Sequence, residues 1–370
     1  MNDALLVPAH VNELKRMLAN EKRLLPVGNR TKPPLSEHEP STLISLRSLA
    51  GIIEYEPSEF TFTAYAGTPL AELRLALAEK RQYLPFDPML VEAGATIGGT
   101  VAAGLSGPGR YRYGGIRDFL LGVRFMSSDG QLMTAGGKVV KNAAGFDIPK
   151  FFVGSMGRFG VLTELTFKVF PKPSATQTLR IVCDSRRQAL ARLSTSASSR
   201  WELDAIDYSF AEQALVLRLA GPPRACASIA SEIRSTWGED VSDLAASDAF
   251  WQSVGGLSWS SSGQTAVKVP TTPQQLFDLN DSLALDEGIH LHGSAAGNVA
   301  WILLDTGEGL SALDRQLRAL QMPGLVIRGP CDRPRLGTWK SWEVERTIQA
   351  AMDPPRKFPR WMHTAEHLPT

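Results

Sequence analysis

The chain has 370 residues, and its 39 basic and 38 acidic side chains leave a formal net charge of +1. This balance offers no general attraction for nucleic acid or for an anionic bilayer, so neither is an expected partner. Its apolar content of 43% is that of an ordinary globular protein. The length exceeds what one hydrophobic core usually serves, which favours two domains.

The amino-terminal segment predicts an amphipathic helix and not a secretion signal. Val11, Leu14, Met17 and Leu18 share one helical face, and no basic start or long apolar run precedes them. No stretch of the sequence approaches the ~18 to 20 uninterrupted apolar residues of a membrane span. We therefore expect a cytoplasmic protein with no membrane span of its own, in which any peripheral contact with the inner membrane is made through partners.

The three cysteines, Cys183, Cys226 and Cys331, lie far apart and form no CxxC pair. This spacing argues against a zinc knuckle or a resident iron–sulfur cluster. We expect reduced cysteines that pack in the protein interior.

Composition divides the chain into two differently built halves. All eight tryptophans lie at Trp201 or later, whereas 16 of the 32 glycines lie between Gly94 and Gly160. The segment FPKPSAT, residues 170–176, has two prolines directly after a predicted strand, where they end the strand and stiffen a linker. The sequence thus predicts one domain over residues 1–173 and a second over 174–370.

The pattern of the first half predicts an α+β fold. It combines a strand that enters a turn at 23–28, a short helix at 71–82, a hairpin at 122–137 that turns at Asp129 and Gly130, and an alternating strand at 161–170. In that last strand Leu165, Phe167 and Val169 face one way. The second half alternates strands and helices, which indicates helices on one face of an antiparallel sheet. The predicted strands are 178–184, 203–210, 213–220, 264–270, 298–305 and 324–329, and the predicted helices are 186–194, 224–237, 273–284 and 309–321.

The segment PVGNRTK, residues 26–32, is the first candidate site. A predicted strand ends there in a turn with a glycine, a hydroxyl and two cations. Consecutive backbone N–H groups in such a turn form a concavity that suits phosphate oxygens. The alternative is a solvated turn that carries basic residues, since short motifs are weak evidence alone.

The segment EAGATIGGTVAAGLSGPGRYRYGG, residues 92–115, is the second. Its glycines expose main chain where side chains would normally intervene, so a bulky flat ligand can contact the backbone directly. Apolar residues such as Ile97, Val101 and Leu105 are unusual in a flexible surface loop, the alternative reading. A buried glycine-rich wall fits better.

A third glycine-rich segment, residues 138–165, predicts a helix at FDIPKFFVG between small-residue turns. It lacks a GxGxxG that opens a helix within a βαβ unit of ~30 residues. The sequence therefore excludes a Rossmann site for NAD.

In their order and spacing these motifs, together with LPFDP at 84–88 and RYGGIRDFLLGVRFMSSDG at 112–130, resemble the p-cresol methylhydroxylase-type FAD domain. More narrowly they are similar to the FAD-binding subunits of bacterial glycolate oxidases. The resemblance covers about Leu24 to Pro173. It implies an α+β fold, in which a FAD domain of two subdomains precedes a cap domain with an antiparallel sheet.

The resemblance also implies an activity. A FAD-dependent 2-hydroxy-acid oxidoreductase of this kind oxidises glycolate to glyoxylate with hydride transfer to flavin, and electrons then pass to a larger flavin subunit and an iron–sulfur subunit. Two alternatives remain open: a noncatalytic flavin relay or structural subunit, and a stand-alone FAD oxidase of another 2-hydroxy acid. No catalytic base is assigned.

The positions that match the cofactor motifs of this family predict the FAD site. They are Pro26, Val27, Gly28, Asn29, Arg30, Thr31, Lys32, Phe86, Asp87, Gly94, Ala95, Thr96, Ile97, Gly98, Gly99, Thr100, Gly104, Tyr113, Gly114, Gly160, Val161 and Leu162. Lys141, Asn142, Gly145 and Asp147 match a motif that shapes the pocket. Relatives often carry three successive small residues where this chain has Gly28, Asn29 and Arg30.

Three further expectations concern side chains. The FAD half has no cysteine, and its histidines, His10 and His38, lie outside the matching motifs, so noncovalent FAD is expected. One of Arg110, Arg112 and Arg117 is a candidate for binding a substrate carboxylate bidentately; the alternative is a solvated loop. His290 and His292 share one face of a predicted strand, but the sequence shows no third ligand, so we expect no metal there.

Overall fold

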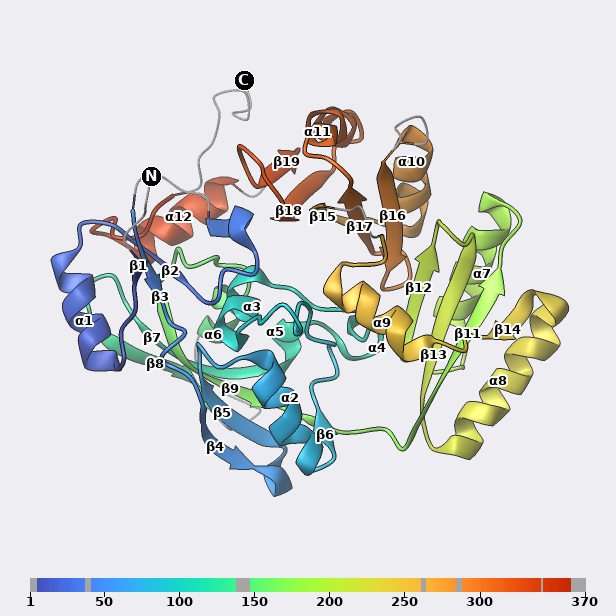
Figure 1. Cartoon of the computed structure of the whole chain (residues 1–370), viewed down its shortest axis with the longest axis horizontal. Helices are drawn as coiled ribbons and strands as arrows, with labels where there is room; N and C mark the ends of the chain where they lie inside the picture. The colour runs from blue at the N-terminus through green and yellow to red at the C-terminus, as the bar shows by residue number, and fades with distance from the viewer. Residues whose placement is uncertain are drawn as a thin grey trace. The chain divides into compact units, whose positions relative to one another are not determined.

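The computed structural model describes residues 5–36, 41–137, 147–260, 264–283, 288–340 and 342–360 (Figure 1). Contacts divide the chain into two compact units. Unit 1 comprises the described parts of Met1–Ser106, Gly115–Pro171 and Trp339–Thr370, and unit 2 comprises those of Gly107–Gly114 and Lys172–Thr338.

Apart from Lys172 and Pro173, which belong with unit 2, these units differ from a simple division into 1–173 and 174–370 at two places. Residues 107–114 belong with unit 2, and the described chain after Thr338 belongs with unit 1. The chain after Thr338 belongs with unit 1 because it makes contacts there. Leu24 N donates to Lys357 O at 2.9 Å, and Phe358 is 2% exposed. Sequence composition carries no signal for either exchange.

A small parallel sheet opens unit 1. Its order is β1 (Leu5–Leu6), β3 (Thr42–Ser45), β2 (Leu24–Val27). The predicted amphipathic helix is α1 (Val11–Asn20), which begins where the His10 side chain accepts a hydrogen bond from Glu13 N and which buries Leu14 and Leu18. That prediction is confirmed.

A five-stranded antiparallel sheet forms the rest of the framework of unit 1. Its order is β4 (Ile52–Glu56), β5 (Thr61–Tyr65), β9 (Val161–Lys168), β7 (Leu120–Met126), β8 (Leu132–Gly136). The expected hairpin at Asp129 is the β7–β8 connection, and Leu165, Phe167 and Val169 are at most 2% exposed, as the alternation predicts. Phe167 stacks on Phe62 with ring centroids 5.7 Å apart.

The other elements of unit 1 are short. They are α2 (Leu70–Glu79), α3 (Ile97–Ala103), α5 (Ile116–Phe119), α6 (Ile148–Phe152), α12 (Trp342–Met352), the strand pair β6 (Gln82–Tyr83) and β10 (Phe170–Pro171), and the 3₁₀ turns η1 (Pro33–Ser36) and η2 (Pro57–Glu59).

Unit 2 is built on one nine-stranded antiparallel sheet. In spatial order its strands are β14 (Val241–Asp243), β11 (Ala175–Val182), β13 (Ala214–Gly221), β12 (Ala205–Ser209), β16 (Ile289–Ser294), β17 (Val299–Leu304), β15 (Thr265–Pro270), β18 (Pro323–Arg328) and β19 (Arg335–Gly337). Its helices and turns are α4 (Arg110–Tyr113), α7 (Arg186–Ser198), α8 (Pro223–Trp237), η3 (Gly238–Asp240), α9 (Ser247–Gly256), α10 (Pro273–Leu283) and α11 (Gly309–Ala319).

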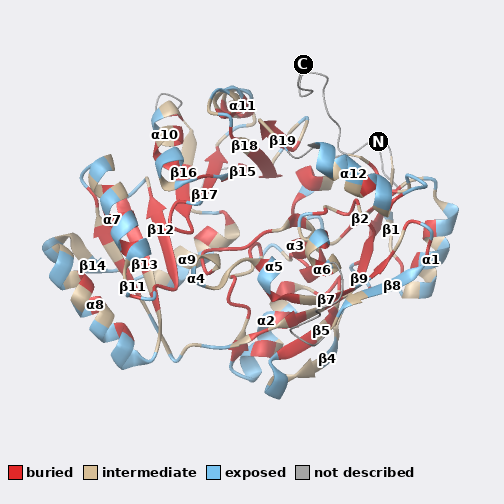
Figure 2. Ribbon diagram, turned by 180° about the vertical axis from the view of Figure 1, so that it is seen from behind, coloured by how far each residue is buried: buried red, intermediate tan, exposed pale blue. Residues whose placement is uncertain are grey.

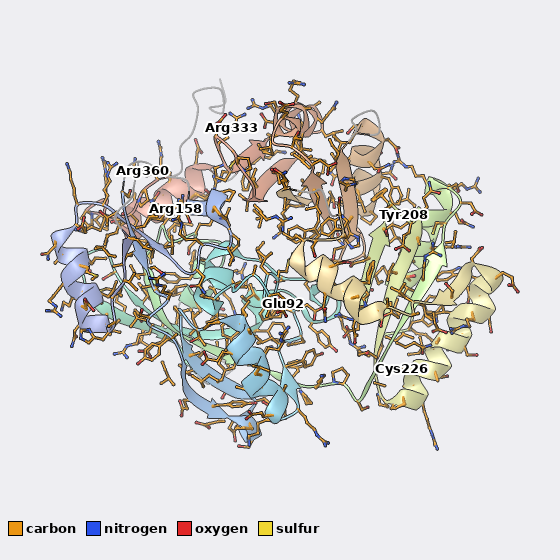
Figure 3. The ribbon with its side chains drawn as sticks, in the orientation of Figure 1. Glu92, Arg158, Tyr208, Cys226, Arg333 and Arg360 are labelled. Carbon is orange, nitrogen blue, oxygen red and sulfur yellow. The ribbon has the colours of Figure 1, made fainter. Side chains whose placement is uncertain are left out.

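The core of unit 2 lies between the sheet and α7, α8, α10 and α11. Alternate strand residues such as Tyr208 and Ile302 pack there with Cys226 of α8 and Leu313 of α11 (Figure 3). Figure 2 shows the central strands buried while outer surfaces of α7 and α8 are exposed. The predicted arrangement of helices on one face of an antiparallel sheet is confirmed.

The other side of this sheet, which we call the second face, carries polar groups. Cross-strand register aligns Ser209, His292, Trp301 and Lys268 in one row on it. Helix α9 lies over part of this face, since the Phe250 ring is 5.9 Å from the His292 ring.

Candidate functional site

Two adjoining pockets in unit 1 form a groove of small residues. Both are lined by Pro26, Val27, Gly28, Thr96, Gly99 and Ala102. The first continues to Leu46, Ala66, Gly98, Ser155, Gly157, Gly160 and Leu162. The second continues to Asn29, Arg30, Thr31, Lys32, Leu35, Ser36, Ala103 and Met156. We call this combined space the groove.

The loop after β2 forms one wall of the groove. Its position is fixed from both sides, because Leu46 N donates to Val27 O at 2.9 Å and the Asn29 side-chain amide donates to Gly94 O at 2.9 Å. Arg30 adopts φ 54°, a left-handed conformation that is uncommon outside glycine. All seven predicted residues from Pro26 to Lys32 line the groove.

The start of α3 forms the facing wall. The Thr96 hydroxyl caps this helix by accepting a hydrogen bond from Gly99 N at 3.2 Å, as expected of a threonine before the first helical turn. Gly98 packs so closely that its N–H donates to Ala66 O at 2.8 Å. The segment that the sequence predicts as a buried glycine-rich wall is therefore a short capped helix.

Glycine is required at these walls for reasons of space. A Cβ at Gly28 would lie 2.3 Å from Thr96 Oγ1, and one at Gly98 would lie 2.6 Å from Ala66 O. Gly157 has φ 75°, and a Cβ there would lie 2.9 Å from Pro26 Cγ. These missing side chains let main chain form the surface, which suits a ligand bound through backbone N–H groups.

Lys32 is the buried cation of the groove. It is 8% exposed, and within the described parts of the chain its Nζ has one hydrogen-bond partner, Thr31 Oγ1 at 3.0 Å, and no ion pair. Burial lowers the pKa of Lys32 to about 8, because desolvation disfavours the charged form.

Twelve predicted cofactor positions line the groove and ten do not. Besides the loop, the lining positions are Thr96, Gly98, Gly99, Gly160 and Leu162. Those outside both linings are Phe86, Asp87, Gly94, Ala95, Ile97, Thr100, Gly104, Tyr113, Gly114 and Val161. Phe86, for example, is fully buried 5.6 Å from the Phe119 ring centroid and packs in the core. Their contact with FAD stays a prediction, and Lys141, Asn142 and Gly145 lie outside the described residues.

The groove also has walls that the predicted set lacks. Ser155, Met156 and Gly157 come from the glycine-rich turn before β9, where the left-handed Gly157 is a usable signal. Leu46 and Ala66 are apolar residues at the ends of strands. Nothing in the sequence separates those two from ordinary core residues.

The three candidate substrate arginines belong to different units. Arg112 belongs to unit 2, where its Nη2 pairs with Glu202 Oε2 at 3.0 Å, whereas Arg117 is an exposed residue of α5 in unit 1. Arg110 also belongs to unit 2. It lies close enough to Lys268 for its charge to add to burial, the larger cause, in lowering the pKa of Lys268 to about 8.

The two histidines pair with carboxylates. On the second face His292 Nε2 lies 2.8 Å from Asp207 Oδ2, and Asp207 Oδ1 accepts hydrogen bonds from the Ser294 hydroxyl at 2.8 Å and from Ala295 N at 3.2 Å. His290 Nε2 lies 2.9 Å from Asp305 Oδ1. Over the described residues there is no group of three or more His, Cys, Asp or Glu side chains placed to hold a metal ion.

Among the described residues, no helix is both long enough and apolar enough to cross a bilayer.

Comparisons with known proteins identify the family of this chain. Residues 3–136 match the model of a family described as FAD binding domain. The glycolate oxidase subunit GlcE of Escherichia coli (strain K12) is 34% identical over 247 residues, which cover 66% of this chain and 67% of that protein. The glycolate oxidase subunit GlcD of Bacillus subtilis (strain 168) is 30% identical over 185 residues, 48% of this chain and 39% of GlcD.

A solved structure extends the likeness to the whole fold. Alkyldihydroxyacetonephosphate synthase in crystal form P1 aligns with a TM-score of 0.69 over 96% of this chain and 76% of its own, at 16% identity. The expected α+β fold, with a p-cresol methylhydroxylase-type FAD domain and an antiparallel cap, is confirmed.

These matches and the fold define a protein with an FAD-binding domain. The chain belongs to the FAD-binding family that contains GlcE. Its cofactor is FAD, and the groove fits that group, because the loop from Gly28 to Thr31 lines it and Lys32 supplies a buried charge there. Noncovalent attachment stays a prediction.

Proposed function

We propose that this chain is the FAD-binding subunit of a glycolate oxidase complex and that it oxidises glycolate to glyoxylate. The chain is an FAD-dependent 2-hydroxy-acid oxidoreductase, as the family model and the relatives GlcE and GlcD indicate. The observation that carries the finer proposal is the glycine-built groove, whose loop from Pro26 to Lys32 matches the phosphate-binding segment of the family.

The residues of unit 1 are proposed to bind and orient the cofactor. Backbone N–H groups of Gly28 to Thr31 donate to the diphosphate, and the Thr96 cap holds the start of α3 where Gly98 and Gly99 can approach the ligand. Bound FAD supplies the hydride acceptor, and the protein supplies position and exclusion of water.

A substrate carboxylate requires a cation in a fixed position. We propose this role for Arg110, Arg112 or Arg117. The guanidinium of Arg112 is engaged with Glu202, and the Arg117 side chain is exposed. Arg110 is half-buried in unit 2, where a charge-assisted hydrogen bond to a carboxylate would be stronger than at the surface.

Electrons from the reduced cofactor need an acceptor outside this chain. Cys183 and Cys226 are buried and Cys331 is half-buried, and among the described residues no group of cysteine, histidine or acidic side chains is placed to hold a cluster. We propose an iron–sulfur subunit and a larger flavin subunit as partners. The names of GlcE and GlcD as subunits support an assembly. In this proposal the chain works in the cytoplasm, and its partners make any contact with the inner membrane.

Anaerobic titration with glycolate tests the proposal. The purified chain should show flavin absorbance near about 450 nm that bleaches when glycolate is added. Bleaching only after the larger subunit is added would instead support a relay role. Turnover with oxygen in the absence of partners would support a stand-alone oxidase. A chain that carries no flavin, alone or in its complex, would refute all three readings.

A further inference from the structure

The ammonium of Lys32 has no charged partner in the described structure. The side chain is 8% exposed, and the hydroxyl of Thr31 is its one hydrogen-bond partner among the described residues. Lysines usually keep the ammonium in water while only the aliphatic stem is buried. Burying the charge without a carboxylate raises the free energy of the folded state unless another anion reaches it.

The pocket beside Lys32 is suited to such an anion. Its lining includes two cations, Lys32 and the exposed Arg30, and no aspartate, glutamate or histidine within the described chain. A third cation, Arg158, contacts residues of the pocket lining through their carbonyl oxygens. The guanidinium of Arg158, which is 1% exposed, donates to Met156 O at 2.6 Å and to Leu35 O at 3.5 Å, and both of those residues line the pocket (Figure 3).

The three cations differ in what they can do. Arginine side chains in general stay charged in proteins, whereas a lysine side chain can lose its proton. Lys32 is the titratable member. Its charge in the empty groove therefore depends on pH within a range that is experimentally accessible.

We propose that Lys32 binds a phosphate oxygen of FAD as an ammonium, so that cofactor binding above neutral pH takes up one proton at this residue. The inference rests on the proposed FAD-binding role of the groove. It adds a regulatory property, which is that the protein retains its cofactor less tightly as the solution becomes alkaline.

The direction of the effect follows from linkage. Burial lowers the pKa of Lys32 to about 8 in the empty groove, and an adjacent diphosphate raises the pKa in the complex. Below pH 8 the ammonium is already present, so affinity does not depend on its titration. Above pH 8 binding must draw a proton from solution, and affinity falls by about tenfold per pH unit until the pH reaches the pKa of the complex.

Flavin fluorescence quenching on the full-length chain tests this proposal. FAD dissociation constants are measured between about pH 6.5 and 9.5, a range in which buried lysines can titrate. For the natural chain we expect a flat profile up to pH ~8 and then weakening by about tenfold per unit. ADP, which has the diphosphate but no isoalloxazine, should compete with FAD and show the same slope.

Two substitutions at Lys32 separate charge from packing. Lys32→Met should bind FAD about tenfold more weakly at pH 7, show no slope, and approach the natural chain at high pH. Lys32→Arg should restore binding at pH 7 and also lose the slope, because its charge does not titrate. Restored binding in Lys32→Arg would show that the fold tolerates replacement at this site.

Arg30→Asn is the matched control. It removes an exposed cation from the same loop, and asparagine tolerates the left-handed φ of 54° found there. We expect a change below about threefold, since the charge is solvated, and the slope of the natural chain. If Lys32→Met kept natural affinity and slope, the inference would be wrong while FAD binding stood. If the natural chain bound no FAD at any pH, the proposed function would fail as well.

Discussion

The two units use opposite ways of making a polar surface. Unit 1 builds its groove from main chain, and a Cβ added at Gly28 would collide with Thr96 Oγ1 at 2.3 Å. Unit 2 buries side chains instead, and Asp207, which is fully buried, is paired with His292 and accepts hydrogen bonds from the Ser294 hydroxyl and Ala295 N. A main-chain surface is damaged by added volume, whereas a side-chain network is damaged by removal.

The difference predicts where each unit is vulnerable. Backbone N–H groups remain when a side chain is changed, so the groove tolerates polar replacements but not bulk. When a buried carboxylate is removed, all the groups that donate hydrogen bonds to it lose their acceptor at once. The four predictions that follow test this contrast, beginning with the largest effect.

Asp207→Ala should have the largest effect on stability. It removes the acceptor shared by His292, Ser294 and Ala295, and each buried donor left unsatisfied costs about 1–3 kcal/mol. We expect the thermal unfolding transition of unit 2 to fall by several degrees. Asp243→Ala is the matched control, because that carboxylate is 59% exposed in its ion pair with Arg234. Equal transition temperatures for the two variants would contradict the contrast.

Gly28→Val should strongly weaken cofactor binding while unit 2 stays folded. The added atoms displace the Thr96 hydroxyl, which accepts the hydrogen bond from Gly99 N and so fixes the wall of the groove. Overpacking of this kind costs about 1–3 kcal/mol, and we expect FAD affinity to fall by about 100-fold. The readout is flavin content after purification. Gly137→Ala is the control glycine of unit 1, because no atom lies within 4 Å of its added Cβ. Full flavin content in Gly28→Val would show that the groove is not the cofactor site.

Lys268→Met should stabilise the protein at pH 7 by about 1 kcal/mol. Burial, with a smaller contribution from the charge of Arg110, lowers the pKa of Lys268 from 10.5 to about 8. Between those values the unfolded chain binds more protons, so the stability of the natural protein rises with pH over that range. The gain from the substitution should therefore be largest below pH 8 and small near pH 10.5. Urea unfolding at several pH values measures it, and a variant less stable at pH 7 would contradict the assignment.

Lys268 and Lys32 sharpen the comparison between the units. Both side chains have a pKa lowered to about 8 by burial. Loss of the proton from Lys268 relieves a buried charge and stabilises the fold. Loss of the proton from Lys32 removes the proposed partner of a ligand. One titration therefore raises stability while the other lowers cofactor affinity.

The sequence predicted the parts of the fold that depend on local pattern. The alternation of Leu165, Phe167 and Val169 placed these residues in the core, and the Asp129–Gly130 turn gave the β7–β8 hairpin. The sequence predicts the loop from Pro26 to Lys32 as part of the site because its residue types indicate a turn with exposed N–H groups. Such signals lie within a few consecutive residues.

Contacts between residues far apart in the chain could not be predicted from the sequence. Nothing near Lys357 indicates that its carbonyl accepts from Leu24 N, and nothing in residues 107–114 indicates that they pack with unit 2. The burial of Lys32 also depends on tertiary packing, with η1 and the turn at Met156 also contributing to its pocket. The sequence therefore predicts Lys32 as a cation near phosphate, but it does not show that the ammonium is buried without a counterion among the described residues.

Arg112→Ala and Glu202→Gln should have the smallest effects on stability, and together they test the role of residues 107–114. Each removes the same ion pair, in which the glutamate side chain is 76% exposed, so each should cost less than about 1 kcal/mol. If the arginine only anchors α4 within unit 2, the two variants should change KM for glycolate equally and little. If Arg112 binds the substrate carboxylate, Arg112→Ala alone should raise KM, because Glu202→Gln leaves the guanidinium in place. Steady-state kinetics on the assembled complex distinguishes these outcomes, and equal KM values would leave Arg110 as the candidate in unit 2.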